Sequence, residues 1–298
     1  MKILNIGSMN IDYVYSVDHI ILPGETESTG DMNIFLGGKG MNQSIALAKA
    51  GALVYHAGLI GSDGQMFLDA CQEYGVNSEL IKQIEGKTGH TIIQVDKHAQ
   101  NSILLYGGAN QQFTEEYIDE VISYFSEGDL LLLQNEVNLL PYIIDRAYEQ
   151  GMKIVLNPSP FNEKLDACDL GKISLFLLNE VEGEQLTGEK ESEAILNGLR
   201  ARFPHAEIVL TLGKDGAIYC GNGVEFHQPI FEVQAVDTTA AGDTFTGYFL
   251  AGMVEGLDIP EIMRRCAKAS SITVTRPGAV ASIPFREEVE ESLRQLKM

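Results

Sequence analysis

The stretch that decides the fold is Asp237-Thr-Thr-Ala-Ala-Gly-Asp-Thr-Phe245, which runs directly into an apolar segment of helix length that ends near Gly256. The start of a helix presents unpaired N–H groups and the positive end of the helix dipole, so it attracts phosphate. A carboxylate here, that of Asp243, would repel a phosphate that is only bound. The carboxylate is consistent with a phosphoryl group that is transferred, because Asp243 could accept the proton of the group that receives the phosphoryl group. The alternative is that Asp243 only caps the helix.

The remainder of the chain predicts an α/β fold. Aliphatic runs alternate with amphipathic segments of helix length, which favours a mainly parallel sheet flanked by helices on both faces. The expected strands are residues 3–6, 55–60, 130–133, 154–157, 175–178 and 208–212, with further short strands at Tyr219 and 231–236. The expected helices are residues 40–50, 65–74, 140–150, 192–202, 242–255 and 260–275. Because no repeat or low-complexity linker interrupts this pattern, we expect one domain over residues 1–298.

Two segments, residues 11–35 and 88–106, alternate between apolar and polar residues and so differ from the continuous aliphatic runs elsewhere. A period of two is typical of strands with one exposed face. We expect the segments to pair into a small antiparallel sheet that forms a lid beside the main sheet; the alternative is ordinary edge hairpins. Such a sheet leaves edges and apolar side chains such as Tyr15 and Leu105 uncovered, so two copies are expected to pack as a homodimer.

Composition excludes several classes of partner. The formal net charge is −21, from 21 basic and 42 acidic residues, so nucleic acid and anionic membrane surfaces are not expected partners. The chain begins with a short strand pattern rather than a signal peptide, and no apolar run is long enough to cross a membrane. The cysteines are far apart, which indicates reduced thiols and predicts a cytoplasmic protein without zinc. They are Cys71, Cys168, Cys220 and Cys266.

Polar residues follow several of the expected strands at the point where each strand ends. In open α/β sheets, ligands bind beyond the carboxyl ends of the strands, so these residues are candidates for a site. They are Ser8-Met-Asn-Ile-Asp12, Gly37-Gly-Lys-Gly-Met-Asn-Gln43, Gln134-Asn-Glu136, Asn179-Glu-Val-Glu182 and Thr211-Leu-Gly-Lys-Asp-Gly216.

These motifs resemble the ribokinase family of carbohydrate kinases, also called the phosphofructokinase-B family. The most specific pieces are residues 37–43 and 237–245. Residues 179–182, 211–216 and 274–279 (Val-Thr-Arg-Pro-Gly-Ala) follow the family pattern in the expected order, and the resemblance extends to about Arg286. It implies transfer of the γ-phosphoryl group of Mg-ATP to a primary hydroxyl of a small neutral sugar, with ribose as the first expectation.

The resemblance also assigns the sugar site, and the residue types agree with it, because carboxylates and amides suit hydroxyl groups. The sugar-binding residues would be Asn10, Asp12, Gly38, Lys39, Asn42, Glu136 and Asp243. Gly38 permits close approach of the backbone, and Lys39 can meet a hydroxyl or neutralise phosphate. The carboxylates of Asp12 and Glu136 would repel a sugar that already carries phosphate, which favours a neutral sugar.

For the phosphate side, the resemblance implies that Ala240, Ala241 and Gly242 form an anion hole and that Asp243 is the catalytic base. The nucleotide would be held by Asn179, Thr211, Gly213, Lys214, Gly216 and Gly242. Glu182 would hold magnesium through water, although Asn179 and Glu182 could equally cap a helix, and both can be true. A monovalent cation, K⁺ by resemblance, would be held by groups of Asp237, Thr239, Thr273, Arg276, Gly278 and Ser282.

Two departures from the family bear on specificity. Ala267 stands where related kinases often carry an imidazole near the adenine, and His90 stands where they tend to have a small residue facing the sugar. A histidine that points inward would indicate a sugar other than ribose. One alternative is a nucleoside kinase on the same fold. The other is a sensor without catalysis, which is disfavoured because Asp243 and the small residues before it are all present.

Overall fold

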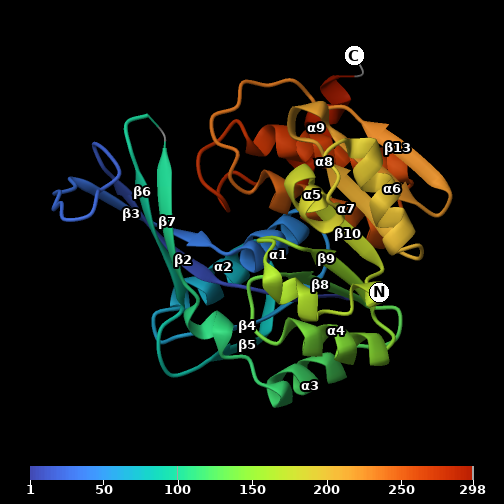
Figure 1. Cartoon of the computed structure of the whole chain (residues 1–298), viewed down its shortest axis with the longest axis horizontal. Helices are drawn as coiled ribbons and strands as arrows, with labels where there is room; N and C mark the ends of the chain where they lie inside the picture. The colour runs from blue at the N-terminus through green and yellow to red at the C-terminus, as the bar shows by residue number, and fades with distance from the viewer. Residues whose placement is uncertain (99, 297–298) are drawn as a thin grey trace.

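The structure is a computed structural model that describes residues 1–98 and 100–296, and it contains two β-sheets (Figure 1). The strands of the larger sheet are β1 (Ile3–Ile6), β4 (Val54–Ile60), β5 (Asn77–Gln83), β8 (Leu130–Gln134), β9 (Lys153–Asn157), β10 (Leu175–Asn179), β11 (Glu207–Thr211), β12 (Ala217–Gly221) and β13 (Val224–Gln228). Their order is β13-β12-β11-β10-β9-β8-β1-β4-β5. The strands from β11 to β5 are parallel, whereas β12 and β13 add an antiparallel edge.

Helices cover both faces of this sheet, as the sequence predicts. They are α1 (Lys39–Lys49), α2 (Gln65–Tyr74), α3 (Glu115–Ser123), α4 (Leu140–Glu149), α5 (Glu180–Thr187), α6 (Ser192–Arg202), α7 (Ala241–Glu255), α8 (Ile259–Thr273) and α9 (Arg286–Gln295). Leu130 and Leu132 of β8 belong to the core cluster that includes α1, α7 and α8, whereas Leu131 and Leu133 belong to the cluster on the opposite face. A strand buried on both faces therefore shows as a continuous run of leucines. No helix of the described chain combines the length and the apolar character needed to cross a membrane.

The smaller sheet is the expected lid, and it projects from one side of the molecule (Figure 1). Its strands are β2 (Asn10–Ser16), β3 (Asp31–Gly37), β6 (Gly89–Val95) and β7 (Asn101–Tyr106), in the order β3-β2-β6-β7. The expectation of a purely antiparallel lid is wrong, because β2 and β6 are parallel. The reason is that β2 continues from β1 and β6 from β5, and these two strands already run in the same direction. Ala99, within the second alternating segment, lies outside the described residues.

A second expectation, a strand at residues 231–236, is also wrong. The outer strand of the edge is β13, which pairs with β12 through a tight turn at Asn222 and Gly223. Both turn residues have positive φ, 51° and 75°, which is the geometry that Asn-Gly favours in a two-residue hairpin. The apolar residues that follow, such as Phe231 and Val233, do not form a strand and instead line a cavity.

The junction between the lid and α1 requires glycine. Gly38 has a φ of +89°, and a Cβ there would lie 2.8 Å from the carbonyl oxygen of Ser8 and 2.9 Å from the backbone nitrogen of Asn10. A side chain would therefore be strained by the backbone conformation and would also collide with the chain that leaves β1. The glycine pair at 37–38 thus brings the start of α1 against the carboxyl end of β1.

Candidate active site

Helix α7 begins within the motif at residues 237–245. Its N-cap residue is Ala240, which adopts a left-handed conformation with a φ of 58°, and Asp243 lies in the first turn with its side chain buried. Asp243 is therefore not the N-cap. The N–H groups at the start of a helix have no partner within that helix. A Cβ added at Gly242 would meet no atom within 4 Å, so the space in front of the helix start is open.

The carboxylate of Asp243 is held by two amide side chains from α1. Asn42 donates from Nδ2 to one carboxylate oxygen at 3.0 Å, and Gln43 donates from Nε2 to the other at 2.8 Å. These side chains reach Asp243 because the two helices pack very closely. A Cβ at Gly247 of α7 would lie 2.4 Å from the Cβ of Ala46 of α1, so only glycine permits this contact.

A cavity of about 220 Å³ lies in front of α7 and collects the predicted anion-hole residues together with several of the predicted nucleotide and magnesium residues. Its lining includes Lys39, Asn179, Glu182, Thr211, Ala240, Ala241, Gly242 and Asp243. Burial alone would lower the pKa of Lys39, but three facing carboxylates raise the pKa above its ordinary value; they belong to Asp243, Glu136 and Glu182. The cavity therefore combines the ammonium of Lys39, which stays charged at neutral pH, with the carboxylate of Asp243 and the start of a helix. This combination suits a phosphoryl group in transfer.

A second cavity of about 450 Å³ adjoins the first and shares Thr211, Ala241 and Gly242 with it. It is also lined by Gly213, Lys214, Gly216, Ile230, Phe231, Val233 and Ala267. The predicted nucleotide residues thus lie together, and the apolar loop that replaces the expected strand 231–236 forms one wall. Ala267 contributes no ring here, but the ammonium of Lys268 lies 5.1 Å from the centre of the Phe231 ring.

The predicted sugar residues lie on the side of the lid. Glu136 accepts hydrogen bonds from the backbone N–H of Lys39 at 2.9 Å and from the hydroxyl of Ser8. Burial raises the pKa of Glu136, while these bonds and the charge of Lys39 oppose the rise. Asp12 accepts a hydrogen bond of 2.5 Å from Thr91 of β6, and burial raises its pKa although that bond opposes it. Both carboxyls are therefore sheltered from water next to the start of α1.

Asn10 is fixed by a residue that the sequence analysis did not identify. Asn110 donates from Nδ2 to Asn10 Oδ1 at 2.8 Å, and it also bonds the backbone N–H and carbonyl of Met9 at 3.0 and 3.1 Å. Asn110 is buried, and it lies in the loop that follows the second lid hairpin. A buried amide with three hydrogen-bond partners fixes the side chain of Asn10 at the start of β2.

His90 points away from this side of the lid. Side chains alternate along a strand, and Thr91, its neighbour, donates to Asp12, so His90 lies on the opposite face. There its ring lies between Tyr13 and Tyr106, with centroid distances of 6.0 and 4.9 Å. His90 therefore does not point inward, and it gives no indication of a sugar other than ribose.

The predicted cation-binding segments are tied together by the carboxylate of Asp237. One oxygen accepts hydrogen bonds from the backbone N–H and hydroxyl of Thr239 at 2.9 and 2.6 Å, and the other from the N–H of Gly278 at 2.9 Å. Burial would raise the pKa of Asp237, but these hydrogen bonds lower it below its usual value. The side chains of Thr273, Arg276 and Ser282 bond Ala269, Glu288 and Ala279, respectively.

The capping interpretation of Asn179 and Glu182 is correct, and it places Glu182 in the first cavity. Asn179 accepts the N–H of Glu182 at 2.9 Å, and Glu182 accepts the N–H of Asn179 at 3.0 Å, which is a complete capping box at the start of α5. The box uses one carboxylate oxygen of Glu182. The buried carboxylate still lines the cavity that contains Asp243.

Besides Asn110, the sequence motifs did not assign a role to four further buried or half-buried residues that support this site. Gln43 lies within the glycine motif at 37–43 and Gln134 stands two residues before Glu136, so both belong to motifs that the sequence shows. Asn157 and Thr91 stand at strand positions without a motif. Their contacts join segments that are far apart in the chain, and for that reason only the fold reveals them.

The chain matches the pfkB family carbohydrate kinase model over residues 1–286. It belongs to this family. It is 36% identical over 297 residues to a ribokinase of Haemophilus influenzae, covering 97% of each chain, and 31% identical over 304 residues to a deoxyribokinase of Salmonella typhi, covering 98% of this chain and 99% of the relative. Among solved structures, the ribokinase of Arabidopsis thaliana complexed with ribose and ATP is 28% identical, with a TM-score of 0.85 and coverage of 98% of each chain.

Family membership confirms the resemblance on which the sequence analysis relied. The protein is a carbohydrate kinase of the ribokinase type, with the α/β fold and the strand lid of its relatives. In this kinase the helix start at Ala240–Gly242 and the carboxylate of Asp243 line one cavity with Lys39, and Asn42 of α1 donates to Asp243.

Proposed function

We propose that this kinase phosphorylates the primary hydroxyl of ribose with ATP to give ribose 5-phosphate. The observation that carries the proposal is the placement of Asp243 in the first turn of α7, where it lines a cavity with Lys39 and the small residues before it. The likeness to ribokinases over nearly the whole chain supports ribose as the acceptor.

The residues of the cavity have complementary roles in the proposed reaction. Asp243 accepts the proton of the sugar hydroxyl while the hydroxyl oxygen forms a bond to the γ-phosphorus of ATP. At the same time, the bond between the γ-phosphorus and the β–γ bridging oxygen breaks. The backbone N–H groups of residues 240–242 and the ammonium of Lys39 stabilise the charge on the group in transfer. ADP leaves with the electron pair of the broken bond.

The acceptor is proposed to lie between the lid and the start of α1. Asn10, Asp12, Asn42 and Glu136 present amide and carboxylate groups toward this space, and the buried carboxyls of Asp12 and Glu136 favour hydroxyl groups over phosphate. Asn42 Oδ1 is buried and has no hydrogen-bond partner within the described chain, so it is free to accept a sugar hydroxyl. The lid would exclude water, which could otherwise receive the phosphoryl group.

Two ions are proposed to assist. Magnesium would be held through water at Glu182, whose buried carboxylate keeps one oxygen outside the capping box, and would neutralise phosphate charge. A monovalent cation, K⁺ by family likeness, would be held by oxygen atoms of Asp237, Thr239, Thr273, Arg276, Gly278 and Ser282. The hydrogen bond from Gly278 to Asp237 brings the two halves of this donor set together, and their oxygen character fits such a cation.

We further propose that the lids of two copies pack together as a homodimer. Cross-strand pairs place Tyr13, Ile34, Ile92 and Leu104 in one row on the face opposite Asp12. Ile34, Ile92 and Leu104 are 50%, 39% and 68% exposed, which is unusual for a small sheet in water. Light scattering should give twice the chain mass for the wild-type protein, and Leu104→Glu should lower it; a monomeric wild-type enzyme with full activity would contradict the dimer.

The proposed activity is tested by ATP turnover across ribose, 2-deoxyribose, hexoses and nucleosides, with Asp243→Asn as the control for background hydrolysis. We expect ribose to give the highest kcat/KM. A preference for deoxyribose would agree instead with the deoxyribokinase relative, and a preference for nucleosides would support the nucleoside-kinase alternative. Absence of turnover with every acceptor would contradict the proposal.

A further inference from the structure

A chain of buried amide side chains leads from the end of β1 to the carboxylate of Asp243. Asn5 donates to the carbonyl of Gly40 at 2.7 Å and to the hydroxyl of Ser44 at 2.8 Å. Gln134 donates to Asn5 Oδ1 at 3.1 Å and to Gln43 Oε1 at 2.6 Å. Gln43 in turn donates to Asn157 Oδ1 at 3.0 Å and to Asp243 Oδ1 at 2.8 Å. Asn5, Ser44, Gln43 and Gln134 are all at most 1% exposed.

The direction of every amide in this chain is determined by two backbone carbonyls, which can only accept. At one end, the carbonyl of Gly40 requires the NH₂ group of Asn5, so Asn5 Oδ1 must accept from Gln134. At the other end, Asn157 Nδ2 donates to the carbonyl of Leu177 at 2.9 Å, so Asn157 Oδ1 must accept from Gln43.

The NH₂ group of Gln43 is therefore fixed from both sides. If Gln43 were flipped, its oxygen would face the oxygens of Asn157 and Asp243, and its nitrogen would face the nitrogen of Gln134. Buried groups paired in this way lose their hydrogen bonds without replacement by water, which is costly. The network thus presents an N–H group, and never an oxygen, to the carboxylate of Asp243.

We propose that Gln43 is a positioning residue for Asp243: its amide holds the carboxylate in one orientation and favours its ionised form. This inference rests on the proposed function, because it concerns the group that takes the sugar proton. A hydrogen bond donated to a carboxylate stabilises the charged form. The amide does this without bringing a positive charge that would pair with the carboxylate and compete with the substrate proton.

The other charged groups that face Asp243 belong to other residues, so a substitution at Gln43 does not remove them. Lys39 of α1 attracts the carboxylate, whereas Glu136 after β8 repels it, and Glu182 of α5 lies across the same cavity. A change in the acid–base behaviour of residue 243 in a Gln43 variant is therefore assigned to the lost amide donor.

The test uses two substitutions at position 43 in the full-length enzyme. Gln43→Met removes the donor, and we expect kcat with ribose to fall roughly tenfold or more while the KM for ATP changes little. The acid limb of the kcat pH profile should move to higher pH, because the carboxylate loses a hydrogen-bond donor. Gln43→Glu keeps the shape and the acceptor for Gln134 but places a second carboxylate beside Asp243, so the pair should retain a proton and move the limb further.

A remote variant and a matched control separate positioning from packing. Gln134→Met leaves position 43 intact but removes one of the two sides that fix its amide, so it should move the acid limb in the same direction by a smaller amount. Gln150→Met makes the same chemical change at an amide that donates to the carbonyl of Phe125, far from the site, and should leave the profile unchanged. Circular dichroism confirms that each variant is folded.

A readout without substrate keeps this inference distinct from the proposed function. The ¹³C signal of the residue 243 carboxyl, assigned by its loss in Asp243→Asn, should titrate at higher pH in Gln43→Met than in the parent protein. An unchanged titration and an unchanged acid limb in folded Gln43→Met and Gln43→Glu would overturn the role of Gln43 whatever sugar is used. Failure of the parent enzyme to turn over any acceptor would contradict only the proposed function.

Discussion

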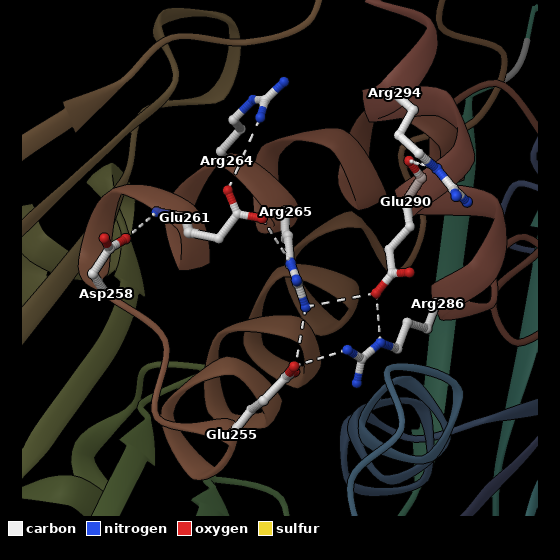
Figure 2. Close-up of polar contacts among 8 residues, drawn as sticks. All are labelled: Glu255, Asp258, Glu261, Arg264, Arg265, Arg286, Glu290 and Arg294. Atoms are coloured by element: carbon white, nitrogen blue, oxygen red, sulfur yellow. Dashed lines mark hydrogen bonds and ion pairs between the residues drawn. The ribbon is translucent and has the colours of Figure 1, made fainter. Parts of the chain in front are cut away.

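Helix α7 carries Asp243 in its first turn and Glu255 in its last, and the surroundings of these two carboxylates differ in burial and in partners. Asp243 is buried and receives hydrogen bonds from two neutral amides, those of Asn42 and Gln43. Glu255 is exposed and pairs with Arg265 at 3.2 Å and with Arg286 at 2.8 Å. Figure 2 shows this second arrangement, in which arginines of α8 and the start of α9 meet the carboxylates of Glu255, Glu261 and Glu290.

The difference shows how one helix can carry both a structural carboxylate and the carboxylate proposed to accept the sugar proton. Arginines neutralise Glu255 and tie three helices together, but exposed ion pairs contribute little to stability because water screens them. Neutral amides orient the carboxylate of Asp243 without neutralising its charge, so the carboxylate can still accept a proton. Each of the following predictions alters one side of this comparison.

The largest effect is expected from Asp243→Asn. The amide keeps the shape but cannot take the proton, so turnover should fall about 10²-fold or more while ATP and sugar still bind. Asp258→Asn is the matched control, since Asp258 also stands at a helix start but only caps α8, accepting the N–H of Glu261 at 2.9 Å. Turnover and binding by calorimetry check both variants; wild-type turnover in folded Asp243→Asn would remove this residue from the mechanism.

A smaller loss of turnover, roughly 10- to 100-fold, is expected for Lys39→Met, because the cavity loses the cation that faces three carboxylates. Since the pKa of Lys39 is raised, the ammonium stays charged through neutral and mildly alkaline pH, and Lys39 should cause no fall in activity there. Arg264→Met, in the exposed cluster, serves as the charge-matched control and should keep full activity. Equal kinetics for both variants would refute the role of Lys39.

Acid stability should depend on His56, which is buried beside Ser44 at the far end of the amide network. Burial lowers the pKa of His56 to about 4 from an ordinary value of 6.5. As the pH falls, the unfolded chain therefore takes up a proton at this histidine before the folded protein does. The contribution of His56 to stability is constant above pH 6.5 and falls by about 3 kcal/mol as the pH drops toward 4.

Urea unfolding of His56→Gln across this range should show a shallower loss of stability than the parent protein. His19→Gln is the control, since His19 is exposed and paired with Glu25, and it should leave the acid slope between pH 6.5 and 4 nearly as in the parent. An identical slope in His56→Gln and the parent would show that another group governs acid unfolding.

The smallest effect is expected from Arg265→Met in the cluster of Figure 2. The guanidinium meets Glu255, Glu261 and Glu290, and its loss should lower the unfolding free energy by about 1 kcal/mol, with the difference shrinking at high salt. Turnover should not change. A large, salt-independent loss would indicate that this network stabilises the protein as a buried one does.

Much of the fold could be predicted from the sequence because periodicity reports burial directly. The leucine run at 130–133 indicates a strand covered on both faces, and the alternation at 88–106 indicates a sheet with an open face. The two wrong predictions arise where the local pattern does not report what covers a side chain or which strand pairs with which. Residues 231–236 look like a strand, but their apolar side chains line a cavity rather than a sheet, and the parallel pairing of β2 with β6 depends on where β1 and β5 lead.

By itself, the sequence determined the α/β class, the lid, the kinase family and the residues of the contiguous motifs, because local pattern and residue type carry that information. Only the tertiary structure decided which way His90 points and which residues hold Asp243. Side-chain direction follows from strand pairing, and the network from Asn5 through Gln134 and Gln43 to Asp243 joins positions up to 200 residues apart. Contacts at such separations exist only after the sheet has assembled, and no local pattern records them.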